Sequence, residues 1–478
     1  AHVLKSNSSN LKVILEMPEQ HWDVVQSTDK LVLKSFTPIE IKPLAGNDVK
    51  DILDHHIPKM EAYHGIKVSP ELREYLIKKT DKFMPNDHQP AKSLKVIANV
   101  LASAEADGKT ELVEDDFDTV IAQHAKLPKS FVGSDSSVKI ETLGPALLER
   151  IFGQDAQINQ IAGTIGLVND GMHDPKKPLA VFYLTGSTGV GKTEIARAIA
   201  AHLFGDEEAV IRVDLGQYHD KHTMARLVGS PPGYVGYGDK GELDEVQKRP
   251  FSVVLFDEAE KSHPDIDNAL LPILDEGKLT KMDGKKLNFK NCVIILTSNL
   301  GARDAEIAAA RKKMGFGSAA KDNSQNMANA IQAEDAAIKA RLKPEFRGRT
   351  KLIRLNNLDR SVAERIALKK IREVSARLQD NNRYKNLKIE LSPTALQQIV
   401  DIGYHPLTGA RPMRDAIENH VQLPLRAWLK ENIDSITNQK VTLVVESVKD
   451  QNEKGEFKIT PQLPPAPPRL SLPAPGLV

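Results

Sequence analysis

The chain has 478 residues, of which 40% are hydrophobic and 27% are charged, a composition ordinary for a globular protein of several domains. Its 65 basic and 64 acidic residues leave a net charge of +1, which excludes a strong general attraction for nucleic acid or for anionic membrane surfaces. The single cysteine, Cys292, excludes an internal disulfide framework and favours a reducing compartment, so a cytoplasmic location is expected. No apolar run of spanning length is found, and no membrane partner is expected.

The N-terminal part contains a pattern that returns near the C-terminus. Residues 37–53 and 64–80 predict a strand, an amphipathic helix, a short strand and a second helix, and residues 350–367 and 387–403 repeat that order. The second helix of each copy follows a Ser-Pro pair, which is typical of an N-cap followed by proline in the first helical turn. These pairs are Ser69-Pro70 and Ser392-Pro393. Chance likeness between two helical hairpins is the alternative, but the shared order of elements favours a duplicated helical module.

The middle of the chain alternates apolar runs with helical segments. Strands are expected at 179–186, 209–215, 251–258 and 291–299. Continuous apolar runs divided by helices predict a parallel sheet covered by helices on both faces, which is an α/β fold. Cys292 begins one of these strands and is expected to be an unreactive core residue.

The segment "GSTGVGKT" follows an apolar strand and precedes a good helix, which is the context that a phosphate-binding loop requires. Glycines let backbone N–H groups surround phosphates, and the helix N-terminus adds positive potential. Lys192 is expected to reach the terminal phosphates and Thr193 to ligate Mg²⁺. A chance glycine turn is the alternative, which the flanking strand and helix disfavour. The predicted phosphate contacts are Gly186, Ser187, Thr188, Gly189, Val190, Gly191, Lys192, Thr193 and the following Glu194.

Polar residues end two further apolar strands. Asp257 and Glu258 close "VVLFDE", and open α/β sheets bind ligands at this end of their strands. Asp257 is expected to contribute to a Mg²⁺ shell, and Glu258 to orient and polarise an attacking water. Asn299 closes "IILTSN" and is expected between the γ-phosphate and that water, although a simple turn residue would fit the same spacing.

Two arginines lie where they could stabilise charge during phosphoryl transfer. Arg349 closes "LKPEFRGR", and Arg411 lies in "TGARPMRD" within the second copy of the repeat. Composition alone favours an ordinary surface or salt-bridge arginine at each position.

The stretch "GSPPGYVGYGDKG", residues 229–241, suits neither a helix nor a strand, because glycine is entropically costly in both and proline removes a donor. It predicts a loop that carries Tyr234 and Val235 between Gly233 and Gly236. A tyrosine folded back on its own domain is one interpretation, and an aromatic side chain presented to a partner is the other.

Taken together, these motifs resemble the Clp branch of the AAA+ ATPases, which are ring-forming protein unfoldases. The resemblance covers about residues 35–445 and is densest at 147–415. Phe152, Gly153 and Gln154 resemble the family's adenine-pocket segment. The resemblance implies an ATP-dependent homo-hexamer in which Arg349 completes a neighbour's site and Arg411 is the second sensor.

The same resemblance implies the substrate. The loop with Gly233, Tyr234, Val235 and Gly236 matches the one that lines the central pore and grips unfolded or tagged polypeptides. The finger motif departs from the family at Gly348, where asparagine is usual.

A further tripeptide resembles the segment with which ClpA-like unfoldases dock on a ClpP-type peptidase. It comprises Met314, Gly315 and Phe316 in a polar, alanine-rich region. Packing of Met314 and Phe316 on their own domain is the alternative. A peptidase-independent disaggregase, a nucleic-acid-dependent AAA+ motor and a non-hydrolysing scaffold remain alternative functions. The neutral charge and the aromatic pore loop argue against nucleic acid, and the intact Lys192, Asp257 and Glu258 argue against a scaffold.

The expected organisation follows from these assignments. The N-terminal copy of the repeat resembles the helical lid of a first AAA+ module, although Lys34 and Ser35 stand where the family carries arginines. The expected parts are a remnant and lid of a first module at 1–127, a linker at 128–146, a large nucleotide-binding domain at 147–355, a small lid domain at 356–447 and a proline-rich disordered tail at 448–478.

Overall fold

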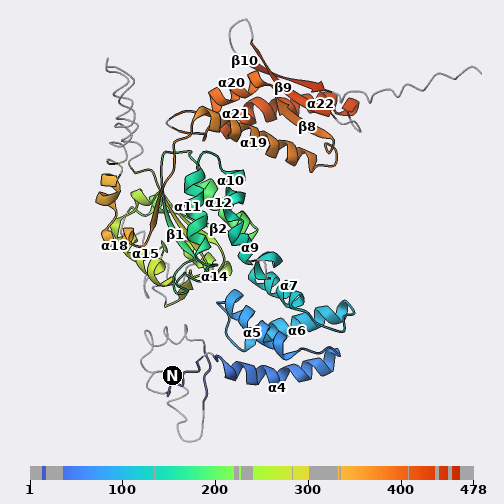
Figure 1. Ribbon diagram of the computed structural model, residues 1–478, viewed down its shortest axis with the longest axis vertical. Coiled ribbons are helices and arrows are strands. Elements are labelled where there is room, and N and C mark those ends of the chain that lie inside the picture. Colours follow the sequence, from blue (N-terminus) through green and yellow to red (C-terminus); the bar gives the residue numbers. More distant parts are fainter. Residues whose placement is uncertain are drawn as a thin grey trace, which may run out of the picture.

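The computed structural model describes residues 13–17, 36–42, 44–133, 136–219, 226–227, 241–281, 284–300, 332, 335–406, 408–436, 441–449 and 455–462. They form an N-terminal helical unit, a central α/β domain and a C-terminal lid. The α/β domain lies between the other two parts, so the helical unit and the lid occupy opposite ends of the molecule (Figure 1).

The N-terminal unit contains the helices α4 (Asn47–His64), α5 (Pro70–Phe83), α6 (Ala91–Ala106) and α7 (Glu114–Ala125). Helix α5 begins as its sequence predicts, with the Ser69 hydroxyl accepting a hydrogen bond from the Leu72 N–H at 3.4 Å. The strand expected at the start of this repeat is not formed, and Ile39 and Ile41 are 84% and 90% exposed. A strand needs a neighbour to accept its hydrogen bonds, and the described residues offer none there.

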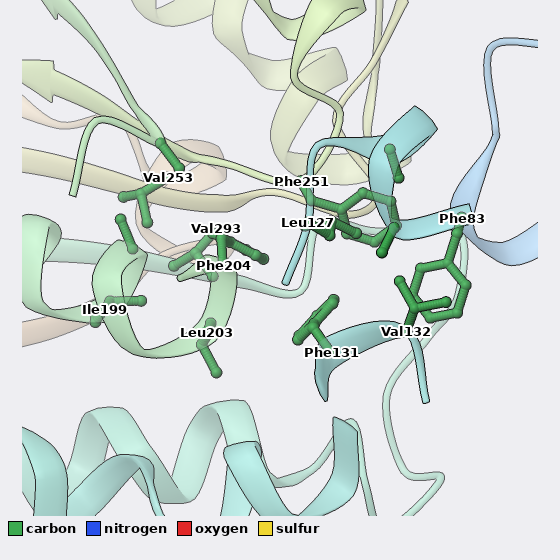
Figure 2. Packing of buried hydrophobic residues seen from close by; sticks show 14 of the residues in the cluster. Phe83, Leu127, Phe131, Val132, Ile199, Leu203, Phe204, Phe251, Val253 and Val293 are labelled. Atoms are coloured by element: carbon green, nitrogen blue, oxygen red, sulfur yellow. The ribbon is translucent and has the colours of Figure 1, made fainter. Parts of the chain in front are cut away.

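The segment 128–146, expected from composition to be a linker, is instead helical and partly buried. It contains α8 (Lys129–Val132), α9 (Ser136–Glu141) and the start of α10 (Leu143–Arg150). Phe131 of α8 lies among the rings of Phe83, Phe204 and Phe251, with centroid distances of 6.2, 5.7 and 5.9 Å (Figure 2). Aromatic packing of this segment therefore holds the N-terminal unit against the α/β domain, whereas its polar composition had predicted an unpacked linker.

Five parallel strands form the sheet of the α/β domain in the order β2-β3-β6-β1-β7. Alternate side chains of β1 enter two cores: Phe182 and Leu184 pack with α12 on one face, and Tyr183 packs with α15 on the other. The prediction of a parallel sheet covered on both faces is confirmed. The strands are β1 (Ala180–Thr185), β2 (Val210–Asp214), β3 (Val253–Asp257), β6 (Val293–Ser298) and β7 (Lys351–Arg354), and the principal helices are α11 (Asp155–Gly166), α12 (Lys192–Phe204) and α15 (Pro264–Glu276).

Shorter elements connect these strands and helices. Cys292, just before β6, is fully buried, and its burial raises the pKa of the thiol to about 12, as an unreactive core residue requires. The connecting elements are η1 (Leu215–Gln217), η3 (Glu242–Asp244), α14 (Glu245–Lys248), η4 (Ala259–Lys261), β4 (Lys278–Thr280), β5 (Lys286–Asn288) and α18 (Pro344–Arg347).

The lid combines helices with a small sheet of order β10-β9-β8. Ser392 caps α20 by accepting a hydrogen bond from the Ala395 N–H at 3.2 Å, which matches the cap of α5. The expected end of the lid at residue 447 falls inside β9, and the expectation of a disordered tail from residue 448 is wrong at 455–462, where β10 pairs antiparallel with β9 and buries Ile459 in the lid core. The lid elements are α19 (Arg360–Gln379), β8 (Leu387–Leu391), α20 (Pro393–Gly403), α21 (Met413–Ile417), the π-helical turn η5 (Glu418–Gln422), α22 (Leu423–Ile436), β9 (Val441–Lys449) and β10 (Gly455–Gln462).

None of the helices in the described ranges combines the length and the apolar character that crossing a bilayer requires.

Candidate nucleotide site

The glycine-rich loop lies between β1 and α12, at the carboxyl edge of the sheet. Gly186, Gly189 and Gly191 have φ angles of 143°, 79° and 108°, a region that side chains with a Cβ rarely adopt. The three glycines therefore allow the chain to curl around the N-terminus of α12. This is the backbone shape that presents N–H groups to phosphate. Val190 is buried beneath the loop and anchors it to the core.

Lys192 begins α12 and turns back into this loop. Its amine donates to the carbonyl oxygens of Gly186 at 2.5 Å and Ser187 at 3.0 Å, and to Asn299 Oδ1 at 2.8 Å. Asn299 follows β6, the strand that pairs directly with β1, although 107 residues separate it from Lys192 in the sequence. The fold thus brings together the two residues that the sequence placed near the terminal phosphate. Thr193 is half-buried in the same first turn of α12.

Asp257 and Glu258 leave the end of β3, and Thr297 of the adjacent strand β6 joins them. The Thr297 hydroxyl donates to Asp257 Oδ1 and accepts a hydrogen bond from the Glu258 N–H at 3.3 Å. Thr297 was not predicted from the sequence, although its place two residues before Asn299 puts it at the same edge of the sheet. Arg212 of β2 also binds Asp257, with Nη2 2.6 Å and Nε 3.2 Å from Oδ2.

Two residues of the turn η4 form contacts in the site that were not predicted from the sequence: Lys261 binds the Glu258 carboxylate, and the Glu260 carboxylate binds Asn299. Lys261 Nζ lies 2.7 Å from Glu258 Oε2. Glu260 Oε1 accepts from the backbone N–H of Asn299 at 3.2 Å and from its side-chain amide at 3.3 Å. One short turn therefore holds both Glu258 and Asn299.

The segment of Phe152, Gly153 and Gln154 lies at the junction between the α/β domain and the lid. Gln154 is fully buried, and its amide exchanges hydrogen bonds of 2.9 and 2.8 Å with the backbone of Asn356. The Phe152 ring lies 4.3 Å from the Arg365 guanidinium carbon of α19. Gln154 thus fixes the junction itself rather than presenting its amide to a ligand.

The lid touches the glycine-rich loop directly. A Cβ added to Gly189 would lie 2.2 Å from the Thr408 carbonyl oxygen and 3.1 Å from the Arg411 backbone nitrogen. The Ala410 N–H donates to the Gly189 carbonyl at 3.4 Å. The structure therefore brings Arg411 to the phosphate loop through its backbone, while its side chain is exposed.

Comparison with known proteins agrees with this architecture. A family model described as "AAA domain (Cdc48 subfamily)" matches residues 177–353, and one described as "C-terminal, D2-small domain, of ClpB protein" matches residues 358–443. The chain is 33% identical over 430 residues to the ATP-dependent Clp protease ATP-binding subunit ClpC of Staphylococcus aureus (strain USA300), which covers 89% of this chain and 50% of that protein. The chain belongs to the Clp/Hsp100 group of AAA+ proteins.

Other relatives of this Clp/Hsp100 chain extend the likeness. The chaperone protein ClpC2, chloroplastic, of Arabidopsis thaliana is 38% identical over 325 residues, covering 68% of this chain and 33% of that protein. A solved S. cerevisiae Hsp104-ADP complex superposes with a TM-score of 0.75 at 26% identity, covering 91% of this chain and 73% of that one. The chain spans about half the length of the Staphylococcus relative.

The side chains of two predicted site residues, Arg349 and Glu194, pair with residues outside the glycine-rich loop. Arg349 follows α18, forms an ion pair with Asp275 of α15 at 2.6 Å and contacts no residue of the glycine-rich loop in the described part of the chain. Gly348 has helical φ and ψ angles, which asparagine at this position could also adopt.

Glu194 pairs with Arg150 at 2.8 Å and so joins α12 to the end of α10.

Two predicted segments lie outside the described residues. They are the predicted pore-loop residues Gly233, Tyr234, Val235 and Gly236, and the predicted docking residues Met314, Gly315 and Phe316. The residues that flank the first segment lie together, because a Cβ added to Gly241 would be 3.3 Å from the Leu227 carbonyl oxygen.

The residues present fit Mg²⁺ bound together with a nucleotide. Within the described ranges, no group of three or more His, Cys, Asp or Glu is arranged to hold a metal ion by protein ligands alone. Mg²⁺ usually takes one or two protein ligands and completes its shell with phosphate and water. The Asp257 carboxylate at the sheet edge and the Thr193 hydroxyl in the first turn of α12 are a donor set of that kind.

Proposed function

We propose that this chain is an ATP-dependent protein unfoldase that threads polypeptides through the pore of a homo-hexamer. The observation that carries the proposal is the hydrogen bond between Lys192 and Asn299, beside the acidic pair at the end of β3. The lid contacts the phosphate loop at the same place. Binding of ATP with Mg²⁺ and cytoplasmic location are parts of the same proposal.

Each residue has a separate task in this proposal. Lys192 and the loop amides bind the phosphates, and Thr193 and Asp257 hold Mg²⁺, which supplies positive charge to the phosphates when bound. Glu258 accepts the proton of the attacking water, and Asn299 orients that water. Arg349, which is partly exposed and pairs with Asp275, stabilises charge in the neighbouring subunit's site, so hydrolysis requires the ring.

We also propose that the unfoldase has a ClpP-type peptidase as its partner. The residues that would dock on this peptidase are Met314, Gly315 and Phe316. A peptidase-independent disaggregase is the second candidate, and it is favoured by the structural similarity to a solved complex titled "Closed State CryoEM Reconstruction of Hsp104:ATPyS and FITC casein", with a TM-score of 0.70 at 26% identity. The two candidates predict different results for Phe316→Ala. Loss of peptidase stimulation with intact unfolding supports docking, whereas no effect with any peptidase supports the second candidate.

Unfolding of a tagged fluorescent protein tests the proposal. Tyr234→Ala is expected to keep ATP hydrolysis and to lose ATP-dependent unfolding, because the aromatic grip is removed while the nucleotide site stays intact. Tyr63→Ala is the matched control, since Tyr63 is 82% exposed on α4 and is expected to leave both activities unchanged. Hydrolysis that nucleic acid stimulates with a steep salt dependence, without unfolding, would contradict the proposal.

A further inference from the structure

The backbone of Glu258 has an unusual conformation. Its φ of 57° makes it, with Lys126, one of two non-glycine residues with positive φ in the described ranges. This conformation turns the chain directly from β3 into η4. The turn brings Lys261 back toward Glu258, so that Lys261 Nζ lies 2.7 Å from Glu258 Oε2.

Gly216 of η1 faces the same carboxylate oxygen. A Cβ added to Gly216 would lie 2.8 Å from Glu258 Oε2, 3.0 Å from Asp214 Oδ1 and 3.6 Å from Lys261 Cδ. Gly216 is not among the residues with positive φ, so alanine fits its backbone without strain. The added methyl group would therefore press most closely on the flexible end of the Glu258 side chain, and next on Asp214 Oδ1, which accepts a hydrogen bond from the Gly216 N–H at 3.0 Å.

The turn that carries Lys261 is itself held firmly. Arg341 donates to the carbonyl oxygens of Ala259 at 3.1 Å and Ser262 at 2.8 Å, and its guanidinium pairs with the buried Asp267. The Lys261 side chain, in contrast, is 56% exposed. An ion pair so exposed adds little to folding stability, and its effect falls mainly on where the Glu258 carboxylate lies.

We propose that Lys261 and Gly216 position the Glu258 carboxylate for water activation, with Lys261 holding Oε2 by charge and Gly216 leaving the space in which it lies. Both are positioning residues, since neither is expected to touch ATP. The inference rests on the proposed role of Glu258.

Variants of Lys261 test the charge contact. Lys261→Met is expected to lower kcat for ATP about tenfold, with KM, affinity for a fluorescent ATP analogue and Tm unchanged. Lys261→Arg is expected to stay within about twofold of the wild type, since it keeps the charge. Lys248→Met is the matched control, because Lys248 forms the same i,i+3 pair with Glu245 and is also 56% exposed, away from the site. A kcat for Lys261→Met equal to that of Lys248→Met, an equal loss in Lys261→Arg, or a fall in Tm or ATP affinity that accompanies the loss would overturn the inference.

Variants of Gly216 test the space. Gly216→Ala is expected to lower kcat about tenfold at unchanged ATP affinity, whereas Gly163→Ala, whose Cβ would meet nothing within 4 Å, should not. Equal kcat in the two variants would overturn the inference. Glu258→Gln distinguishes failure of the proposed role of Glu258 from failure of the positioning inference. If it hydrolyses ATP at the wild-type rate, the proposed role of Glu258 fails; if it is inactive while Lys261→Met and Gly216→Ala are active, only the positioning inference fails.

Discussion

The hydroxyl of Thr297 contacts both acidic residues of the site. It donates to Asp257 and accepts from the Glu258 backbone, and the residue is 1% exposed. A buried hydroxyl of this kind fixes two neighbours at once, because its loss removes a hydrogen bond from each and, within the described residues, leaves Asp257 with its Arg212 contacts alone. The geometry of the acidic pair therefore depends on a residue that belongs to the next strand of the sheet.

Replacement of Thr297 by valine is expected to lower the ATP turnover number about tenfold and to destabilise the protein by about 1–3 kcal/mol, since shape is kept while two hydrogen bonds are lost. Steady-state ATPase assays and thermal unfolding measure the two effects. Thr185→Val is the matched control, because Thr185 is equally buried in β1 and its hydroxyl has no hydrogen-bond partner among the described residues. Equal turnover in the two variants would contradict this role of Thr297.

At the scale of the element, the phosphate loop and the lid meet through glycines. Gly409 has a φ of 59°, and a Cβ added to it would lie 2.8 Å from the Gly189 carbonyl oxygen. No side chain fits between the two segments. Close approach of these backbones is what holds Arg411 next to the phosphate loop.

Gly409→Ala is expected to weaken ATP binding about tenfold, because the methyl group pushes the lid from the loop. Titration with a fluorescent ATP analogue measures this effect. Gly108→Ala serves as the control for backbone strain, since Gly108 has a φ of 68° and its Cβ would meet nothing within 4 Å. If both variants bind ATP equally, the contact between lid and loop does not support nucleotide binding.

Strands and motif residues of the α/β domain were predictable because each leaves a local pattern. The run at 253–258 is apolar up to two carboxylates, and the structure has β3 at Val253–Asp257. Contacts between elements leave no such pattern, which is why Thr297 and Glu260 were missed, and the Lys261 contact depends on the left-handed backbone of Glu258. Composition also failed at 128–146, where the few apolar residues, among them Phe131 and Leu143, are the ones that become buried.

Across the whole molecule, the N-terminal helical unit and the α/β domain share one core. Phe131 contributes the ring between Phe83 of α5 and Phe204 at the end of α12, and these residues belong to a single hydrophobic cluster (Figure 2). Helix α12 begins at Lys192, so it connects the phosphate loop to the N-terminal unit. The two parts are expected to unfold together.

Phe131→Ala is expected to cost about 3–5 kcal/mol and to separate the unfolding of the N-terminal unit from that of the α/β domain. Scanning calorimetry should show one transition for these parts in the wild type and two in the variant. A single transition that only moves to lower temperature would mean that Phe131 adds stability without joining the two parts.

ATP binding and ATP turnover by Glu258→Gln, measured side by side, are the decisive test of the proposed nucleotide site. We expect ATP affinity equal to that of the wild type and turnover at least about 100-fold lower, because the phosphate contacts remain while the proton acceptor is lost. Turnover at the wild-type rate would contradict the proposal, since another group would then have to activate the water.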